Sequence, residues 1–256
     1  MRLPFLAVFA AGALALAPHA AFASHHKAAD IFAAVTAPGR PADAIALDES
    51  RKPAEVLAFL GLKPGMTAAD LMTGTGYWAE IMSRVVGPKG HVTAFQPTQF
   101  YNDAKGLEMW NGLLGRTSNV TLATYPFESF AATPDSFDFA IVNLSYHDLY
   151  WESEKYKIPR TDPAAYLKTL YMAMKPGGVV GVIDHVGLPG DTRETVEKFH
   201  RIDPDVVKAD WTAAGFVLEE ESALLRNPAD DHSENVFAPG IRGKTDRFLF
   251  RFRKPK

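Results

Sequence analysis

An acidic residue and two glycines stand close together in the segment 67–96. Asp70 ends a short apolar stretch, Gly74 and Gly76 follow it, and residues 77–86 then carry apolar side chains at helical spacing. Glycine permits backbone torsions, and a close approach of a ligand, that a side chain would block. A carboxylate at this turn would repel a pyrophosphate but attract a cationic amino-acid end. The pattern therefore predicts a nucleotide-binding βαβ unit whose ligand carries such an end.

A second group of reactive side chains follows the strongly apolar run 137–144. Residues 143–148 read NLSYHD and include His147 and Asp148. Histidine has an unperturbed pKa of about 6.5, so His147 is suited to accept a proton from a bound ligand, and Asp148 could orient its ring. The alternative interpretation is that His147 and Asp148 only cap the following loop.

Alternating strand and helix patterns position both groups. Apolar runs and helical periodicity predict a parallel sheet, because strands that alternate with helices run in the same direction. In an open sheet of this kind ligands bind beyond the carboxyl ends of the strands, which is where both groups would lie. The predicted strands are 67–72, 91–95, 120–123, 137–144 and 179–183, the predicted helices are 28–37, 51–60, 77–86, 104–114, 164–174 and 204–214, and an antiparallel edge pair is predicted from 216–223 and 247–252.

Residues 1–23 have the features of a secretory signal peptide. They contain one Arg, an apolar run over 3–17 and the small-x-small sequence Ala21-Phe22-Ala23. That run of about 15 residues is shorter than the roughly 20 needed to span a bilayer. We therefore expect a periplasmic or secreted protein with no stable membrane insertion once the signal is removed, followed by an N-terminal helical cover over 24–66 and one domain over 67–256.

The composition excludes several classes of function. The 27 basic and 30 acidic residues give a formal net charge of −3 without a long basic block, so nucleic acid is not an expected partner. The chain has no Cys, which excludes disulfides and thiolate metal sites. No metal site is expected: Asp184-His185 with His200 and Asp203 could supply ligands, but structural hydrogen bonds explain these residues more simply. The polar loop 226–244 is expected to be flexible.

These residues resemble class I S-adenosylmethionine-dependent methyltransferases. The resemblance rests on the turn 70–76, the strand 91–95, the Lys175-Pro176-Gly177-Gly178 turn and the closing strand pair. It implies an α/β, Rossmann-like methyltransferase fold with a mostly parallel seven-stranded sheet, a C-terminal antiparallel strand pair and helices on both faces. The runs 200–203, 225–228 and 243–248 also resemble a narrower group of exported predicted methyltransferases, whose acceptor is not defined.

The resemblance implies S-adenosylmethionine as cofactor and methyl transfer to a small-molecule or envelope acceptor. Two positions depart from the family pattern: Met72 replaces the first glycine of the turn, and Gln96 replaces the acid that binds the ribose hydroxyls. Glu128 is the nearest match to the acid that contacts adenine. The predicted cofactor-binding residues are Asp70, Met72, Gly74, Gly76, Tyr77, Gln96, Glu128 and Asn143, and the predicted catalytic residues are His147, Asp148 and Tyr146.

Two alternatives remain open from the sequence. Met72 and Gln96 would also suit a methyltransferase scaffold that lost turnover and now binds a nucleoside-like ligand. The pattern Gly74-x-Gly76-x-x-Ala79 matches a dinucleotide-binding motif, which would fit a nicotinamide-dependent oxidoreductase.

Overall fold

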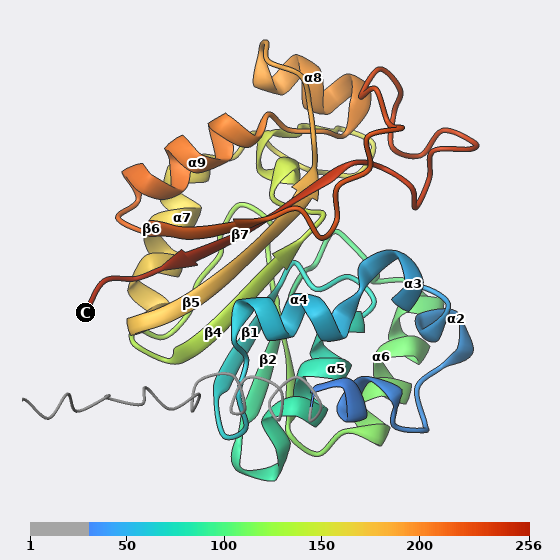
Figure 1. The fold of residues 1–256 in the computed structure, drawn as a ribbon, viewed down its shortest axis with the longest axis vertical. Coiled ribbons are helices and arrows are strands. Elements are labelled where there is room, and N and C mark those ends of the chain that lie inside the picture. The colour runs from blue at the N-terminus through green and yellow to red at the C-terminus, as the bar shows by residue number, and fades with distance from the viewer. Residues whose placement is uncertain (1–30) are drawn as a thin grey trace, which may run out of the picture.

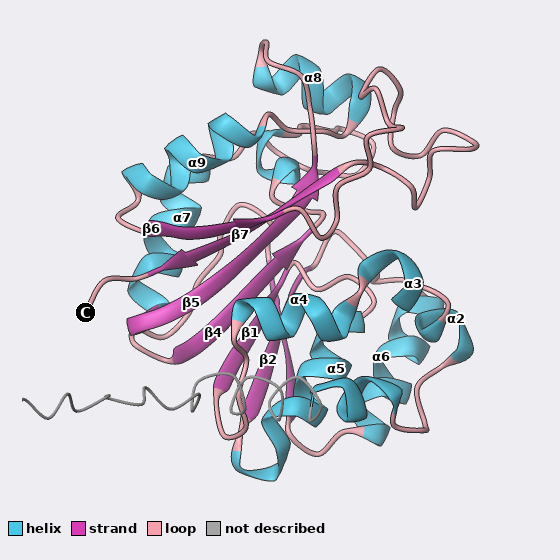
Figure 2. Ribbon diagram, in the orientation of Figure 1, coloured by secondary structure: helices cyan, strands magenta, loops and turns pink. Residues whose placement is uncertain are grey.

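A computed structural model describes residues 31–256 of the protein. The described chain forms a seven-stranded sheet with helices on both faces (Figures 1 and 2). The strand order is β3-β2-β1-β4-β5-β7-β6; β1 to β5 pair in parallel, and β7 runs antiparallel to both β5 and β6. The predicted fold class is therefore confirmed. The strands are β1 Thr67–Leu71, β2 His91–Pro97, β3 Val120–Tyr125, β4 Phe137–Asn143, β5 Met174–His185, β6 Val217–Ser222 and β7 Arg247–Arg253.

The helices cover the two faces of this sheet. α4 and α5 lie over one face, and α7 and α9 lie over the other, as Figure 1 shows. The alternating side chains of β4 explain the two layers, since Phe139 and Ile141 join one buried apolar cluster while Ala140 and Val142 join the other. The helices are α2 Ala42–Ile45, α3 Asp48–Arg51, α4 Pro53–Leu60, α5 Tyr77–Val86, α6 Ala104–Arg116, α7 Pro163–Ala173, α8 Thr192–Phe199 and α9 Pro204–Ala213, and two 3-10 turns are η1 Gly87–Lys89 and η2 His147–Tyr150.

The order of the strands reverses at β1. The chain proceeds from β1 outward to β2 and β3, and then returns to place β4 on the other side of β1. The connection that leaves β1 leads to β2 on one side, and the connection that leaves β4 leads to β5 on the other side. The two connections therefore separate at the carboxyl ends of β1 and β4. A ligand crevice forms at such a switch point, so the fold itself places the loops after β1 and β4 around one site.

The N-terminal cover differs from its prediction. Residues 31–36 are helical, in line with the prediction for 28–37, whose first residues lie outside the described chain. The single helix expected over 51–60 is two helices, because Lys52 adopts a left-handed φ of 46° between α3 and α4. Pro53 starts α4, and Gly61 ends it with φ 81°.

The strand β5 begins five residues earlier than predicted. α7 ends at Ala173 and β5 starts at Met174, so the Lys175-Pro176-Gly177-Gly178 turn lies inside the strand as an irregularity in its pairing with β4. Gly177 has φ 83°, a torsion that glycine adopts readily. The helix α8 had no counterpart in the sequence prediction.

The loop 226–244 is tied to the body of the protein, which differs from the flexible loop expected. Asp230 accepts two hydrogen bonds from Arg201, at 2.8 and 3.0 Å, and both side chains are buried. Asp246 accepts two more from Arg226 at 2.8 Å each. Val236, a residue of the loop itself, is buried. The sequence shows that the loop is polar, but it cannot show that its charged residues pair with partners 20 or more positions away. The polar composition therefore suggested a flexible loop.

Removing one partner of the Arg201–Asp230 pair should destabilise the fold strongly. In Asp230→Asn the buried guanidinium would lose its charged acceptor, and breaking a buried pair in this way costs about 3–5 kcal/mol. The free energy of unfolding, measured by urea denaturation, should fall by that amount. Arg160→Gln is the matched control, because its pair with Glu152 is solvent-exposed and should contribute less than about 1 kcal/mol. Equal effects of the two substitutions would contradict a structural role for the buried pair.

The predicted signal peptide over 1–23 lies outside the described residues. Among residues 31–256, no helix combines the length and the apolar character that a bilayer crossing requires.

Candidate functional site

A cavity of about 580 Å³ opens at the carboxyl ends of β1, β2 and β4. Its volume falls within the roughly 300–1,000 Å³ of small-molecule sites. One end is lined by the turn after β1, and the other by residues that follow β4, by His185 at the end of β5 and by His200. The predicted site residues that line it are Asp70, Met72, Gly74, Gln96, Asn143, His147 and Asp148. The structure thus brings the two groups singled out in the sequence to opposite ends of one cavity.

Asp70 organises the turn directly. Its Oδ2 accepts a hydrogen bond from the backbone N–H of Ala79, at 2.9 Å, and another from the Thr73 hydroxyl. Burial raises the pKa of Asp70 to about 7, although these two hydrogen bonds and nearby Arg51 act in the opposite direction. Its Oδ1 has no hydrogen-bond partner among the described residues, and Asp70 lines the cavity. This oxygen is therefore left to accept a hydrogen bond from a ligand.

Gln96 supports the same turn from the neighbouring strand. Its Oε1 accepts from the backbone N–H of Gly74 at 2.9 Å, and its Nε2 donates to the Phe100 carbonyl at 3.2 Å. The side chain that the resemblance assigns to ribose binding is therefore already engaged within the protein. Met72 stands in the position of a family glycine and has φ 48°, so the left-handed backbone of the turn is kept without the glycine.

Gly76 lies outside the cavity lining, and a packing constraint explains its identity. Its φ is 76°, and an added Cβ would lie 2.4 Å from Leu113 Cδ1 and 3.0 Å from Trp110. Gly74, by contrast, lines the cavity, and a Cβ there would meet only the Tyr101 ring at 3.5 Å. The two glycines thus separate into one that faces the ligand and one that lets α6 pack against the turn.

Gly76→Ala should therefore lower the free energy of unfolding by roughly 2–4 kcal/mol. This is the cost of overpacking against α6 added to the cost of a left-handed torsion at a residue with a Cβ. Urea denaturation measures this. Gly115→Ala is the matched control, since Gly115 is an exposed residue of α6 with nothing within 4 Å of an added Cβ, and alanine should raise the helix stability there by about 0.5–1 kcal/mol. A neutral Gly76→Ala would show that α6 does not constrain the turn.

Arg51 is a cavity residue that the sequence analysis did not identify. Its guanidinium carbon lies 4.4 Å from the centroid of the Tyr77 ring. The guanidinium has no hydrogen-bond or ion-pair partner among residues 31–256, and Arg51 lines the cavity with Asp70. Burial lowers the pKa of Arg51. Nothing in the local sequence marks this residue, because it reaches the site only through the unpredicted break at Lys52.

His147 occupies the other end of the cavity and is held by Asp184. The His147 Nδ1 lies 2.8 Å from Asp184 Oδ1, and the backbone N–H of His147 donates to Asp184 Oδ2 at 2.9 Å. Burial opposes protonation of the ring, but Asp184 and Asp148 outweigh it and raise the pKa of His147 to about 9. The residue that orients the ring is therefore Asp184 and not Asp148, which lies 3.4 Å from the Nε2. Asp184 follows His147 by 37 positions, so no local pattern links the two.

Besides Gly76, three predicted site residues lie away from the cavity lining. Tyr146 is fully buried and its hydroxyl donates to Asp210 at 2.8 Å, so its side chain does not reach the cavity. Glu128 accepts from Gln99 at 3.3 Å and does not line the cavity, and the Tyr77 hydroxyl donates to Asp48 at 2.7 Å. Strand and helix patterns gave the positions of these residues, but not the direction in which each side chain points.

Aromatic side chains complete the end of the cavity near His147. Three of them line it: Trp151, Tyr156 and Phe237. The His200 ring packs between Trp151 and Phe237, with centroid distances of 5.1 Å to each. Asp203, which was considered with His200, instead caps α9.

Comparisons with known proteins agree with this architecture. A family model described as protein-L-isoaspartate(D-aspartate) O-methyltransferase matches residues 45–105. Demethylmenaquinone methyltransferases from Staphylococcus aureus are 26% identical over 125 residues, which is 49% of this chain and 45% of theirs. The chain thus spans less than half the length of these curated relatives.

Solved structures extend the comparison to most of the chain. A SAM-dependent methyltransferase from Aquifex aeolicus has a TM-score of 0.58 at 20% identity, covering 84% of this chain and 99% of its own. An S-adenosylmethionine-dependent methyltransferase from Mesorhizobium loti has a TM-score of 0.56 at 17% identity, covering 81% and 99%. These proteins give no support to the oxidoreductase or binding-protein alternatives. The chain has the Rossmann-like fold of S-adenosylmethionine-dependent methyltransferases, and the family model, the curated relatives and these structures are all of methyltransferases.

Proposed function

We propose that the protein transfers the methyl group of S-adenosylmethionine to a small-molecule acceptor. The observation that carries this proposal is the single cavity that joins the Asp70 turn to the Asp184–His147 pair. Methyl transfer is an in-line displacement, so its catalyst must hold an acceptor atom about 3 Å from the methyl carbon. A cavity with a cofactor end and an acceptor end satisfies this requirement.

The cofactor would lie with its amino-acid end between Asp70 and Arg51. S-adenosylmethionine carries an ammonium group and a carboxylate there, and Asp70 and Arg51 offer the complementary charges within one cavity. Its nucleoside would extend past Gly74 toward Gln96. Because Gln96 already bonds to Gly74 and Phe100, we expect the protein to hold the cofactor mainly through its amino-acid end.

Arg51→Met should therefore weaken binding of S-adenosylmethionine by roughly tenfold or more, since a hydrogen bond to a charged group contributes about 1.5–3 kcal/mol. Isothermal titration calorimetry measures this. The matched ligand is 5′-methylthioadenosine, which lacks the amino-acid end and should bind the variant and the unaltered protein equally. Equal losses for both ligands would place Arg51 elsewhere than at the carboxylate.

The acceptor would lie between His147 and the aromatic residues Trp151, Tyr156 and Phe237. A pocket lined by aromatic side chains and by the polar His147 suits a small planar ring that carries a polar substituent. The curated relatives are named for demethylmenaquinone, a ring acceptor, which agrees with this class. We therefore infer an aromatic or quinol-type acceptor for this chain.

The activity can be tested with methyl-labelled S-adenosylmethionine and a panel of phenols, catechols and quinols. Formation of S-adenosylhomocysteine in step with a labelled product supports the proposal. Cofactor binding without product from any acceptor of the panel would contradict the proposed acceptor class.

We also propose that the protein is exported, on the strength of the signal-like residues 1–23. Mass spectrometry of the N-terminus in a periplasmic fraction tests this. A mature chain that starts at Ser24 supports export, whereas an intact Met1 in the cytosolic fraction contradicts it.

A further inference from the structure

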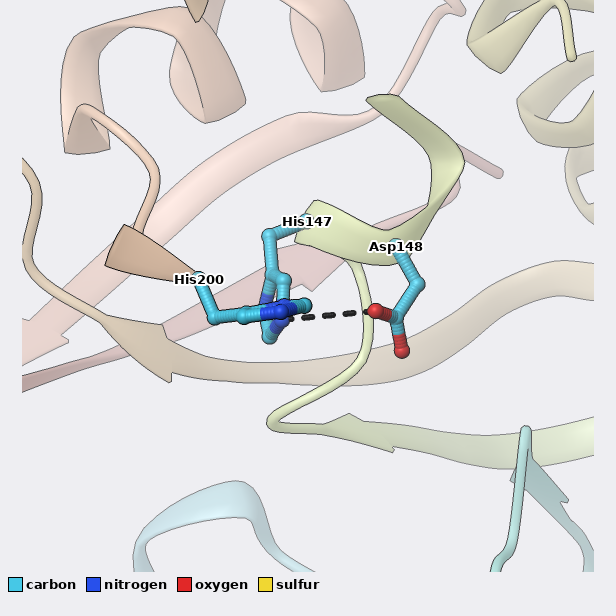
Figure 3. Close-up of side chains that lie close together, drawn as sticks. All are labelled: His147, Asp148 and His200. Atoms are coloured by element: carbon cyan, nitrogen blue, oxygen red, sulfur yellow. Dashed lines mark ion pairs between the residues drawn. The ribbon is translucent and has the colours of Figure 1, made fainter. Parts of the chain in front are cut away.

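Three potential metal ligands converge at the acceptor end of the cavity. Figure 3 shows the rings of His147 and His200 and the carboxylate of Asp148 turned toward one another. One ligand atom from each lies within 4.8 Å of the other two. The Nε2 of His147 is 3.4 Å from Asp148 Oδ1. Two ligands of one tetrahedral ion, each about 2.1 Å from it, are separated by roughly 3.4 Å, so this pair already has the spacing of a bound ion.

Asp184 prepares His147 to act as a ligand. Its Oδ1 accepts from Nδ1 at 2.8 Å, so Nε2 is the ring nitrogen left to bind an ion, which would displace the proton that Nε2 carries in the charged ring. Asp184 is fully buried, and its Oδ2 accepts from the backbone N–H of His147, so this carboxylate is fixed in place. Metal-bound histidines commonly donate their second N–H to a carboxylate in this way, which fixes the ring and raises the basicity of the ligand.

The other two groups have little else to bind. Apart from the contact with His147, the carboxylate of Asp148 has no hydrogen-bond partner among residues 31–256, and neither ring nitrogen of His200 has one in that part of the chain. His200 directly follows α8 as its left-handed C-cap, with φ 50°. Packing between Trp151 and Phe237 then holds its ring toward the cavity. His147 is buried, whereas Asp148 and His200 are half-buried, so their ligand atoms converge on one point that is open to the cavity.

We propose that His147, Asp148 and His200 bind a divalent transition-metal ion, most simply Zn²⁺. Two imidazoles and one carboxylate are a ligand set that such ions prefer, and three protein ligands leave positions free for another molecule. All three residues line the cavity, so the free positions face the acceptor. This proposal replaces the sequence-based expectation that the protein has no metal site.

The role of the ion rests on the proposed methyl transfer and narrows its acceptor class. A hydroxyl oxygen of the acceptor would bind the ion, and its pKa would fall. The O–H proton would leave to solvent, the oxygen would form a bond to the methyl carbon, and the C–S bond would break with its electron pair remaining on sulfur. The products are a methyl ether and S-adenosylhomocysteine. The inferred acceptor is therefore a phenol, catechol or quinol that coordinates the ion through oxygen.

Calorimetric titration of the chelator-treated full chain with Zn²⁺ tests the site. We expect one ion per chain at micromolar affinity or tighter, and a loss of at least 100-fold in both His200→Ala and Asp148→Asn. Asp184→Asn should weaken binding by 10- to 100-fold, the range seen when a carboxylate behind a ligand is altered. His232→Ala is the matched control, because His232 pairs with Asp246 outside the cavity and its loss should leave the affinity unchanged.

Two further measurements keep the outcome interpretable. The His25→Ala/His26→Ala variant removes any adventitious binding by the histidine pair near the start of the chain, and thermal unfolding checks that each variant is folded. Binding that survives in both folded variants, His200→Ala and Asp148→Asn, or that disappears in His25→Ala/His26→Ala, would overturn the metal site. S-adenosylmethionine binding in the presence of chelator separates the two proposals, because it should persist even if no metal binds.

Discussion

His147→Gln should reduce methyl transfer by at least about 10²-fold while leaving S-adenosylmethionine affinity unchanged. His147 is the buried side chain that links Asp184 to the acceptor end of the cavity. Groups that activate an acceptor in this position contribute typically 10²–10⁴-fold. The cofactor end lies at the other end of the same cavity, so binding there should not depend on the ring. Glutamine is chosen because its amide still donates to Asp184 and does not leave that buried carboxylate without a partner.

The measurement combines initial rates of S-adenosylhomocysteine formation with a calorimetric cofactor titration on the same sample. His91→Gln is the matched control, since His91 lies at the amino end of β2, far from the cavity edge of the sheet, and contacts Thr121. It should keep full activity. A His147→Gln protein with normal turnover, or one that loses cofactor binding and turnover together, would contradict the assignment of His147 to the acceptor end.

Asp70→Asn should weaken S-adenosylmethionine binding by roughly 10- to 150-fold. The ionised carboxylate offers Oδ1 to the cofactor's ammonium group, and a hydrogen bond to a charged group contributes about 1.5–3 kcal/mol. Asparagine has nearly the same shape and can still accept from the N–H of Ala79, so the turn should remain folded. Asp138→Asn at the amino end of β4 is the matched control: it removes the same charge from a pair with Lys175 on the opposite edge of the sheet.

The affinity of the unaltered protein for S-adenosylmethionine should rise between pH 5.5 and 7. Burial raises the pKa of Asp70 from its ordinary 3.8 to about 7, so the free protein holds the proton at pH 5.5 and has lost it in half of the molecules at pH 7. The cofactor's ammonium group, with an ordinary pKa of about 7.7–8.0, stays mostly protonated over this range. The ionised fraction of Asp70 increases roughly 15-fold between pH 5.5 and 7, and affinity should increase with it.

Calorimetric titrations at pH 5.5, 6.2 and 7 measure this dependence. Asp70→Asn should bind weakly at all three pH values, because it has no proton to lose, while Asp138→Asn should follow the unaltered protein. An affinity that is flat with pH in the unaltered protein, or a pH dependence that survives in Asp70→Asn, would show that Asp70 does not contact the ammonium group.

The sequence was sufficient to predict the sheet because each strand is defined locally. The run FAIV over 139–142 is apolar on both faces, which only a central strand requires, and α5 has a regular apolar period over the residues predicted for it. The turn after β1 was likewise predictable, since an acid followed at short spacing by two glycines, between a strand pattern and a helix pattern, is typical of a ligand-binding turn.

The acceptor end could be predicted only in part because its residues meet across long distances in the chain. Asp184 contacts His147 from the carboxyl end of β5, and His200 does so from the residue that follows α8. Both residues were noticed in the sequence, but they were grouped with Asp203, which caps α9. Side-chain direction was the other missing quantity: Tyr146 and His147 are neighbours, yet one points toward Asp210 and the other into the cavity.

Parallel calorimetric titrations of the protein with S-adenosylmethionine, S-adenosylhomocysteine and NAD test the central claim most directly. The cavity with Asp70 and Arg51 at one end predicts micromolar binding of the first two ligands, about −8 kcal/mol, and no binding of NAD, whose pyrophosphate the Asp70 carboxylate would repel. Binding of NAD, or no binding of either adenosyl compound, would contradict the assignment of this cavity to S-adenosylmethionine.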